Sequence, residues 1–447
     1  MNIRARLSHS LFALLIVLSL TTPSWRYGTF SLWPILAFEH LAGGPVAIGL
    51  FNLVPILFLL AWTLSQAKSA SWSWGPKAMT LPLFFFTVWA LLRLVDAPAR
   101  LLFIFGGDFL FVWLVYLYCV NRRPPLKLAL ASIIVIQGLV GCLQFVFQRD
   151  LGLTLIGELP LNPAFSGVTV LRARGLPWLR AYGLTAHPNL YGALLALCLL
   201  LLLVWRPPRS RQETLALLPI FALGLAGLFF SFSRTAWLAG ALSFLVWLVL
   251  SRRGITGQGC SWLRWLLFPT LILIIALALY GDLVFSRVAN FQEPLEARSI
   301  NQRLYDAGLA LQLARMHPLL GVGLGRNVDA AARIAENAER VHNVLLLAAA
   351  ELGMPGLILV LWLLLAPLRP YWRLCHQGQY VRCAAGLGPW LLVLLVNQLD
   401  TTLWLTANWQ TAILFGLAAG NAAVNLLQET KERPLQPARV VAARSEG

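Results

Sequence analysis

The sequence contains few charged residues. Asp, Glu, Lys and Arg make up 12% of its 447 residues, and only 18 residues are acidic. This shortage excludes an ordinary soluble domain, in which about 25% of residues are charged. Hydrophobic residues make up 59% instead, in continuous runs near the roughly 20 residues that cross a bilayer. Because these runs do not alternate with polar residues, they also exclude a membrane β-barrel. The sequence therefore predicts an all-α polytopic membrane protein, with residues 1–447 forming a single integral membrane domain.

The N-terminal apolar run lacks a clean small-x-small cleavage site, so it is predicted to remain as the first membrane helix. Segment 28–42 is apolar but short and contains Pro34, which predicts an interfacial or re-entrant piece. Hydropathy and turn residues predict about twelve transmembrane helices, at residues 9–26, 45–66, 80–95, 101–120, 126–148, 188–205, 214–231, 235–251, 263–281, 342–366, 384–400 and 403–427.

Lysine is also scarce, and its distribution indicates the orientation. With the N-terminus in the cytoplasm, the cytoplasmic segments carry twenty of the thirty-five cations, including all four lysines, but only four acids. Positive loops stay in the cytoplasm, so both termini are predicted there, with 428–447 as a cytoplasmic tail. No cysteine falls in an outer loop, where thiols would oxidise.

The outer face is predicted to carry two long hydrophilic loops, at 149–187 and 282–341. The second lies between the ninth and tenth helices, and loops of this length are usually functional. Every outer cation is arginine. Arginine grips phosphate through a planar fork, although a general preference of this chain for arginine explains the count equally well.

Four polar segments with distinct residues fall on that outer face. In the segment 302–325, apolar residues recur every three or four positions, which predicts an amphipathic helix of about four turns that stops at Pro318. No strand precedes its "GVGLG" and no "GK[ST]" follows, so that stretch is predicted as a turn rather than a nucleotide loop. The segments are "RAYGLTAHPNLYG" (180–192), "SFSRTAWLAG" (231–240), "QRLYDAGLALQLARMHPLLGVGLG" (302–325) and "RVHNVLLLAAAELGMPGL" (340–357).

Together these segments resemble the O-antigen ligase and polymerase superfamily, and most of all the O-antigen ligases. The resemblance covers roughly residues 180–366, and its features are Arg180 with Gly183 and Asn189, "SRT" at 233–235, Arg303 ahead of "HPLLGVGLG", and "HNVLLLAAAELGMPGL". It implies a glycosyltransferase of the Gram-negative inner membrane, with its active site facing the periplasm. Such an enzyme moves O-antigen from undecaprenyl diphosphate to lipid A–core oligosaccharide during lipopolysaccharide biosynthesis. The outer loops would then be periplasmic.

The chain has no Asp-x-Asp metal motif, and its outer acids form no obvious ligand set. We therefore expect no metal and no cofactor. Preorganised guanidinium groups can stabilise the charge that develops on a diphosphate leaving group. Arg303 and Arg234 are the predicted catalytic arginines, with Arg180 and Arg298 as further substrate-binding residues.

His342 is the predicted catalytic base, because imidazole titrates near neutral pH and this residue heads an apolar helix at the outer boundary. Asn343 and Asn189 are predicted to bind substrate, and Asn343 could also orient His342. A structural role is the alternative for a histidine at a helix end, and snorkelling is the alternative for Arg234. His187 and His317 each precede a proline at a helix boundary, where turn geometry explains them.

Two other functions remain open. An O-antigen polymerase would use lipid-linked repeat units as acceptor, and it must bind the same diphosphate. A membrane transporter, a more distant alternative, would require ionisable residues near mid-bilayer, for which Asp108 and Gln137 are the few polar candidates within the predicted spans.

Overall fold

The structure is a computed structural model of the chain. It describes residues 3–21, 34–38, 46–49, 62, 72–95, 97–156, 158–173, 175–205, 211–254, 261–288, 294–404 and 408–427. The helices are α1 (Ile3–Thr21), α3 (Lys77–Leu92), α4 (Ala99–Arg122), α5 (Lys127–Phe147), α6 (Pro188–Trp205), α7 (Arg211–Phe230), α8 (Arg234–Gly254), α9 (Ser261–Val288), α10 (Pro294–Met316), α11 (Asn327–Ala331), α12 (Val344–Leu365), α13 (Leu368–His376), α14 (Tyr380–Leu399) and α15 (Trp409–Leu427). A 3-10 turn spans Thr154–Ile156, and the strands are β1 (Pro34–Phe38), β2 (Val46–Gly49), β3 (Val170–Ala173) and β4 (Leu176–Leu179).

The mostly helical fold confirms a polytopic membrane protein. Within the described ranges, seven helices are long and apolar enough to cross a membrane, and four apolar helices are shorter. Eleven of the twelve predicted spans coincide with a helix. The twelfth, 45–66, is wrong at its start, because Val46–Gly49 is a strand that pairs with Pro34–Phe38. The described residues therefore do not confirm the count of twelve. Glycine and proline around this β-branched segment disfavour a helix there. Residues 50–61 and 63–66 lie outside the described residues, as do most of 28–42 and the whole tail 428–447.

The expectation of an all-α chain also misses a second small sheet. β3 and β4 form an antiparallel hairpin with Val170 opposite Leu179 and Ala173 opposite Leu176. The hairpin lies within the predicted loop 149–187. Gly175, at φ +76° between the two strands, provides the left-handed turn that this tight connection needs.

α15 lies at the centre of the bundle and is buried along most of its length. Gly416 and Gly420 stand four residues apart on the face that meets α4, and a Cβ at either position would press on Val112 or Cys119. Small residues at this spacing let two membrane helices approach closely. The packing of α4 on α15 therefore follows from glycine positions in the sequence.

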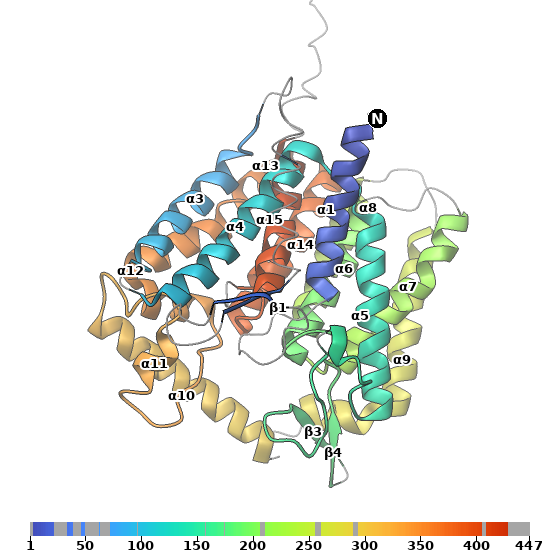
Figure 1. Cartoon of the computed structure of the whole chain (residues 1–447). Coiled ribbons are helices and arrows are strands. Elements are labelled where there is room, and N and C mark those ends of the chain that lie inside the picture. The colour runs from blue at the N-terminus through green and yellow to red at the C-terminus, as the bar shows by residue number, and fades with distance from the viewer. Residues whose placement is uncertain are drawn as a thin grey trace, which may run out of the picture.

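The two ends of the bundle differ. Figure 1 shows the N-terminus and α13 at one end, and α10, α11 and the β3–β4 hairpin at the other. Cys375 of α13 and Cys383 of α14 form a disulfide at the first end. The sequence places this end of the bundle in the cytoplasm, where disulfides are rare. The disulfide therefore does not support the argument that all cysteines lie away from the oxidising side of the membrane.

α10 confirms the predicted loop helix and is longer than predicted, because it already begins at Pro294. Proline is favoured in the first turn of a helix, where its missing N–H costs nothing. The helix ends at Met316, just before Pro318, as the sequence indicated. The following "GVGLG" is a turn in which Gly321, Gly323 and Gly325 all have positive φ.

Backbone hydrogen bonds join this turn and the residues before it to a break in α12. Gly353 interrupts α12 with φ +70° and ψ −172°, next to Pro355, and the amide of Met354 donates to the carbonyl of Pro318 at 2.7 Å. The carbonyl groups freed by the break are also satisfied: Ala350 O accepts from Val322 N at 2.8 Å, Glu351 O from Gly323 N at 2.9 Å and Leu352 O from the indole of Trp89 at 3.0 Å. The interlock fixes the end of α10 against α12, the helix that follows His342.

Candidate functional site

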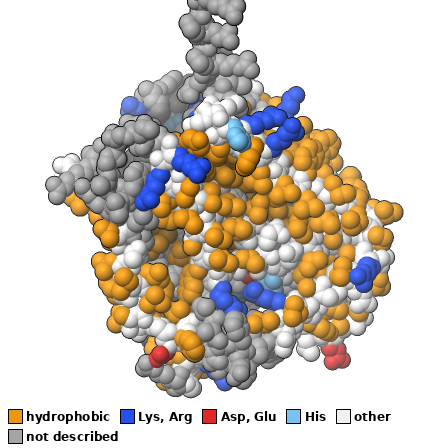
Figure 2. Space-filling view, turned by 180° about the vertical axis from the view of Figure 1, so that it is seen from behind, with side chains coloured by type: hydrophobic (Ala, Val, Ile, Leu, Met, Phe, Trp, Pro, Cys, Tyr) orange, Lys and Arg blue, Asp and Glu red, His pale blue; other side chains and the backbone are white. Residues whose placement is uncertain are grey.

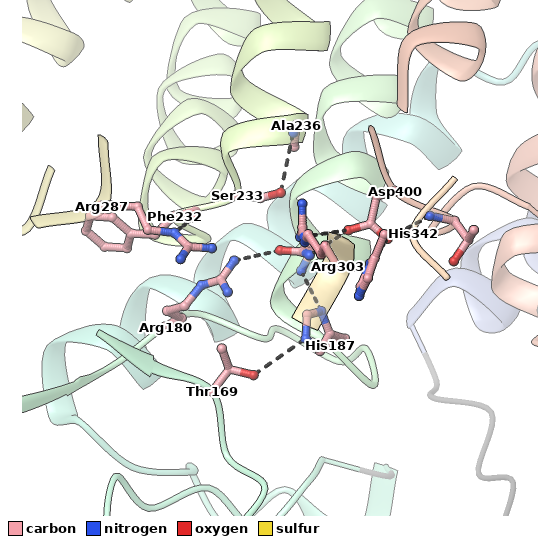
Figure 3. A network of polar contacts seen from close by, with 12 residues as sticks. Thr169, Arg180, His187, Phe232, Ser233, Ala236, Arg287, Arg303, His342 and Asp400 are labelled. Carbon is pink, nitrogen blue, oxygen red and sulfur yellow. Dashed lines mark hydrogen bonds and ion pairs between the residues drawn. The ribbon is translucent and has the colours of Figure 1, made fainter. Parts of the chain in front are cut away.

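Asp400 is the centre of a polar network at the end of the bundle that carries α10. It follows α14 in an extended conformation, and only 2% of it is exposed. Its Oδ1 accepts from the backbone amide of Thr401 at 2.7 Å, and its Oδ2 accepts from Asn189 Nδ2, also at 2.7 Å. The carboxylate therefore joins the end of α14 to the first turn of α6 (Figure 3).

His342 and Arg303 approach the same carboxylate from the solvent side. His342 Nδ1 lies 3.3 Å from Asp400 Oδ1, and Arg303 Nη2 lies 3.9 Å from Oδ2. The side chains of His342 and Arg303 are 32% and 30% exposed, whereas that of Asp400 is 3% exposed. An imidazole and a guanidinium thus cover a buried carboxylate and remain open to a substrate.

The charge state of Asp400 follows from these contacts. Burial by itself would raise the pKa of the carboxyl, but the hydrogen bond to His342 and the nearby charge of Arg303 outweigh it and lower the pKa below its ordinary value. Asp400 is therefore an ionised carboxylate at neutral pH. A carboxylate on Nδ1 favours the imidazole tautomer with the proton on Nδ1 and leaves Nε2 as the acceptor.

Arg180 and Asn189 extend the network into the core. Arg180 is 2% exposed, and its Nε donates to Ser231 O at 2.7 Å while its Nη2 donates to Asn189 Oδ1 at 2.7 Å. Asn189 in turn donates to Asp400. Both predicted substrate-binding residues therefore lie at the site and are engaged with protein groups. Arg180 holds Asn189 in place, and Asn189 in turn holds the carboxylate of Asp400.

Arg234 and Arg287 form a second pair of guanidinium groups nearby. Arg234, the first residue of α8, donates from Nη1 to Arg287 O at 3.2 Å, and Arg287, at the end of α9, donates from Nε to Phe232 O at 3.1 Å. Phe232 has φ +45°, so the α7–α8 turn is tight enough to present its carbonyl to Arg287. Figure 3 shows Arg287, Arg180 and Arg303 around the same space as Asp400.

His187 also lies at this site. Its Nδ1 accepts from the Asn189 amide at 3.1 Å, and its Nε2 lies 3.5 Å from Thr169 Oγ1, just before β3. Burial and the nearby Arg180 lower the pKa of His187 below its ordinary value. It is thus a neutral histidine that connects the β3–β4 segment to the start of α6. Pro188 explains why His187 lies at the start of α6, but it does not account for the contacts of the imidazole with Asn189 and Thr169.

The remaining predicted residues lie at the rim. Asn343 caps α12 by accepting from Leu346 N at 3.0 Å, and it donates to Gln398 O at 2.9 Å, two residues before Asp400. It thereby holds the start of α12 against the end of α14. Arg298 belongs to α10, but its side chain is outside what the structure describes. His317 is exposed at the far end of α10.

Two residues of the network were missing from the sequence prediction. Asp400 is the last residue of the predicted span 384–400, in "VNQLDTTLW", and an acid at the end of an apolar helix is rare enough to have been a signal. Arg287 stands in "FSRVAN", with no feature to separate it from the other outer arginines. Among the described residues, no group of three or more His, Cys, Asp or Glu is placed to hold a metal ion.

Residues 219–361 match the family described as O-antigen ligase. The match confirms the resemblance to the O-antigen ligase and polymerase superfamily, and it contains Arg234, Arg287, Arg303 and His342. Arg180, Asn189 and Asp400 lie outside the matched segment, although the fold brings them to the same site. A comparison with curated proteins found no match.

Proposed function

We propose, from the match of residues 219–361 to the O-antigen ligases, that this protein transfers O-antigen polysaccharide from undecaprenyl diphosphate to lipid A–core oligosaccharide. It would act at the periplasmic face of the Gram-negative inner membrane. The observation that carries the proposal is the contact of His342 Nδ1 with the buried carboxylate of Asp400, with Arg303 at the other oxygen.

His342 is the base in this proposal. Asp400 holds Nδ1, so Nε2 is free to take the proton of the acceptor hydroxyl. The hydroxyl oxygen then forms a bond to the anomeric carbon while the bond from that carbon to the diphosphate oxygen breaks. The electron pair leaves on the diphosphate, and a single in-line displacement inverts the anomeric centre. Asp400 stabilises the imidazolium that forms and keeps the ring oriented.

Arginines neutralise the leaving group. Arg303 is partly exposed beside the base, and Arg234 is partly buried at the start of α8. Both can offer N–H groups to phosphate oxygens, and preorganised donors of this kind lower the barrier without a metal ion. Arg180 and Asn189 position Asp400 from below, and Asn343 fixes the start of α12. Arg298 remains a further candidate for binding substrate.

A lipid-linked donor needs a charged site next to a hydrophobic surface. Figure 2 shows basic side chains beside a histidine and an acidic side chain, within a face of the molecule that is otherwise mostly hydrophobic. In this proposal a polyprenyl tail lies against the hydrophobic face while its diphosphate reaches the basic side chains. The arrangement supports lateral entry of the donor from the bilayer.

The test is glycan transfer by the purified protein in EDTA, with undecaprenyl-diphosphate-linked O-antigen as donor. Lipid A–core and lipid-linked repeat units are offered separately as acceptors, and we expect product with lipid A–core. Product only with repeat units would make the protein an O-antigen polymerase. Loss of turnover in EDTA would refute the metal-independent mechanism.

Variants assign the roles. His342→Ala is expected to abolish transfer, because it removes the partly exposed imidazole that Asp400 orients to take the proton. His317→Ala is the matched control, since His317 also lies at a helix end but is exposed just after the end of α10, outside the network around Asp400. Full transfer by inserted His342→Ala protein would rule out His342 as the base. Uptake of solute into proteoliposomes without a covalent product would favour the transporter.

A further inference from the structure

α13 presents a basic and aromatic stripe at the end of the bundle opposite the candidate site. Arg369, Trp372, Arg373 and His376 stand at positions i, i+3, i+4 and i+7 of this nine-residue helix, and all four are exposed. Residues at this spacing share one helix face. Trp372 is 68% exposed, and its ring meets that of His376 at a centroid distance of 4.7 Å.

The opposite face of α13 is fixed to the bundle. Tyr371 and Leu374 are fully buried, and the Tyr371 hydroxyl donates to Ala422 O of α15 at 2.6 Å. The Cys375–Cys383 disulfide ties α13 to the first turn of α14. Because α13 is held from one side, the stripe is a preformed surface whose side chains alone must be ordered by a ligand.

Within the part of the chain that the structure describes, no acidic side chain pairs with the arginines of this stripe. No Asp or Glu occurs between residues 352 and 399. The guanidinium groups of Arg369 and Arg373 make no hydrogen bond or ion pair with any part of the chain that the structure describes. By contrast, Arg382 close by donates to Gln379 and to Asn425 O. Arg369 and Arg373 are thus free to bind an anion.

The position of α13 indicates which anion. α13 is the last part of the candidate membrane span Val344–His376, which begins with α12. Because α12 with its 22 residues is long enough to cross the bilayer, the stripe lies near the level of lipid headgroups. Arginine forks match phosphate oxygens, and tryptophan is enriched at the membrane interface. Figure 2 shows basic side chains and a histidine together at this end of the molecule, above the hydrophobic belt.

We propose that the α13 stripe binds the headgroup of an acidic phospholipid. Arg369 and Arg373 contact the phosphate, and Trp372 packs against the glycerol region. The site is separate from the candidate active site and does not depend on the proposed function. It would fix the tilt and depth of α12 and α14, the two helices whose other ends carry Asn343 and Asp400.

The test is native mass spectrometry of the detergent-solubilised full-length protein, titrated with phosphatidylglycerol or with phosphatidylcholine. We expect tighter binding of phosphatidylglycerol, and roughly 30-fold weaker binding in the double variant Arg369→Gln/Arg373→Gln. The matched control is Arg252→Gln/Arg253→Gln, which removes two exposed arginines from the C-terminal turn of α8. This control should keep the phosphatidylglycerol affinity of the unaltered protein.

A second measurement does not depend on removing charge. Brominated phosphatidylglycerol should quench part of the tryptophan fluorescence, and the quenched part should be absent in Trp372→Phe. Equal binding of the two lipids, as expected if the stripe docks a soluble protein, would overturn the proposal. Equal losses in the two double variants, or unchanged quenching in Trp372→Phe, would also overturn it.

Discussion

Replacing Asp400 by Asn is the sharpest test of the candidate site. The substitution keeps the shape of the side chain and its contact with the Thr401 amide, but it removes the negative charge opposite His342 Nδ1 and Arg303. Oδ1 accepts from Thr401 N and also contacts His342 Nδ1, so an Asn that keeps the Thr401 contact presents its neutral amide oxygen to the imidazole. This oxygen can still orient the ring, but it stabilises the imidazolium less than a carboxylate does.

The size of the effect follows from the lost contact. A hydrogen bond to a charged group contributes about 1.5–3 kcal/mol, and this bond becomes fully charged only when His342 takes the proton. The loss therefore acts on the transition state and should lower kcat roughly 10- to 150-fold with little change in KM. The long 3.9 Å contact of Arg303 adds little to this figure.

The assay is single-turnover transfer from undecaprenyl-diphosphate-linked glycan to purified lipid A–core. Glu158→Gln is the matched control, because Glu158 is also a buried carboxylate that accepts from backbone amides, Leu151 N at 2.9 Å and Leu153 N at 2.7 Å, but it has no contact with His342. The control should lose stability and keep its kcat. An Asp400→Asn protein that folds and turns over at the unaltered rate would refute the role given to the carboxylate.

Three other outcomes follow from the structure. Gly353→Ala should lower the free energy of unfolding by about 1–3 kcal/mol in a thermal melt in detergent, because φ +70° with ψ −172° suits only glycine and a Cβ would lie 2.5 Å from Leu319 O. The free energy of unfolding should fall as the pH drops below 6.5, the ordinary pKa of histidine, because His187 has a lower pKa in the folded protein and the unfolded chain binds the proton first. His187→Gln should remove this part of the pH dependence of Tm. The Cys375–Cys383 pair tests the orientation: alkylation in intact cells should find thiols if α13 faces the reducing cytosol, and protection by the disulfide would place this end in the periplasm.

Some residues of the candidate site could be predicted from their neighbours in the sequence. His342 and Asn343 stand just before a long apolar helix, and Arg303 lies on a helix whose apolar spacing and terminal Pro318 are visible in the sequence. These features depend on neighbours within a few turns. Where the sequence failed, at 45–66, hydropathy was satisfied but the Gly- and Pro-containing backbone paired as a strand over Val46–Gly49 instead.

The sequence by itself determined the membrane class, most of the helices, the loop helix and the resemblance to the O-antigen ligases, because hydrophobic runs and local motifs act over short distances along the chain. Only the tertiary structure decided what Asp400, Arg180 and His187 do. Asp400 and Asn189 are 211 residues apart, and they meet because the end of α14 packs beside the start of α6. A buried carboxylate is stable only where several donors converge on it. That convergence is a property of the packed helices, which no single segment contains.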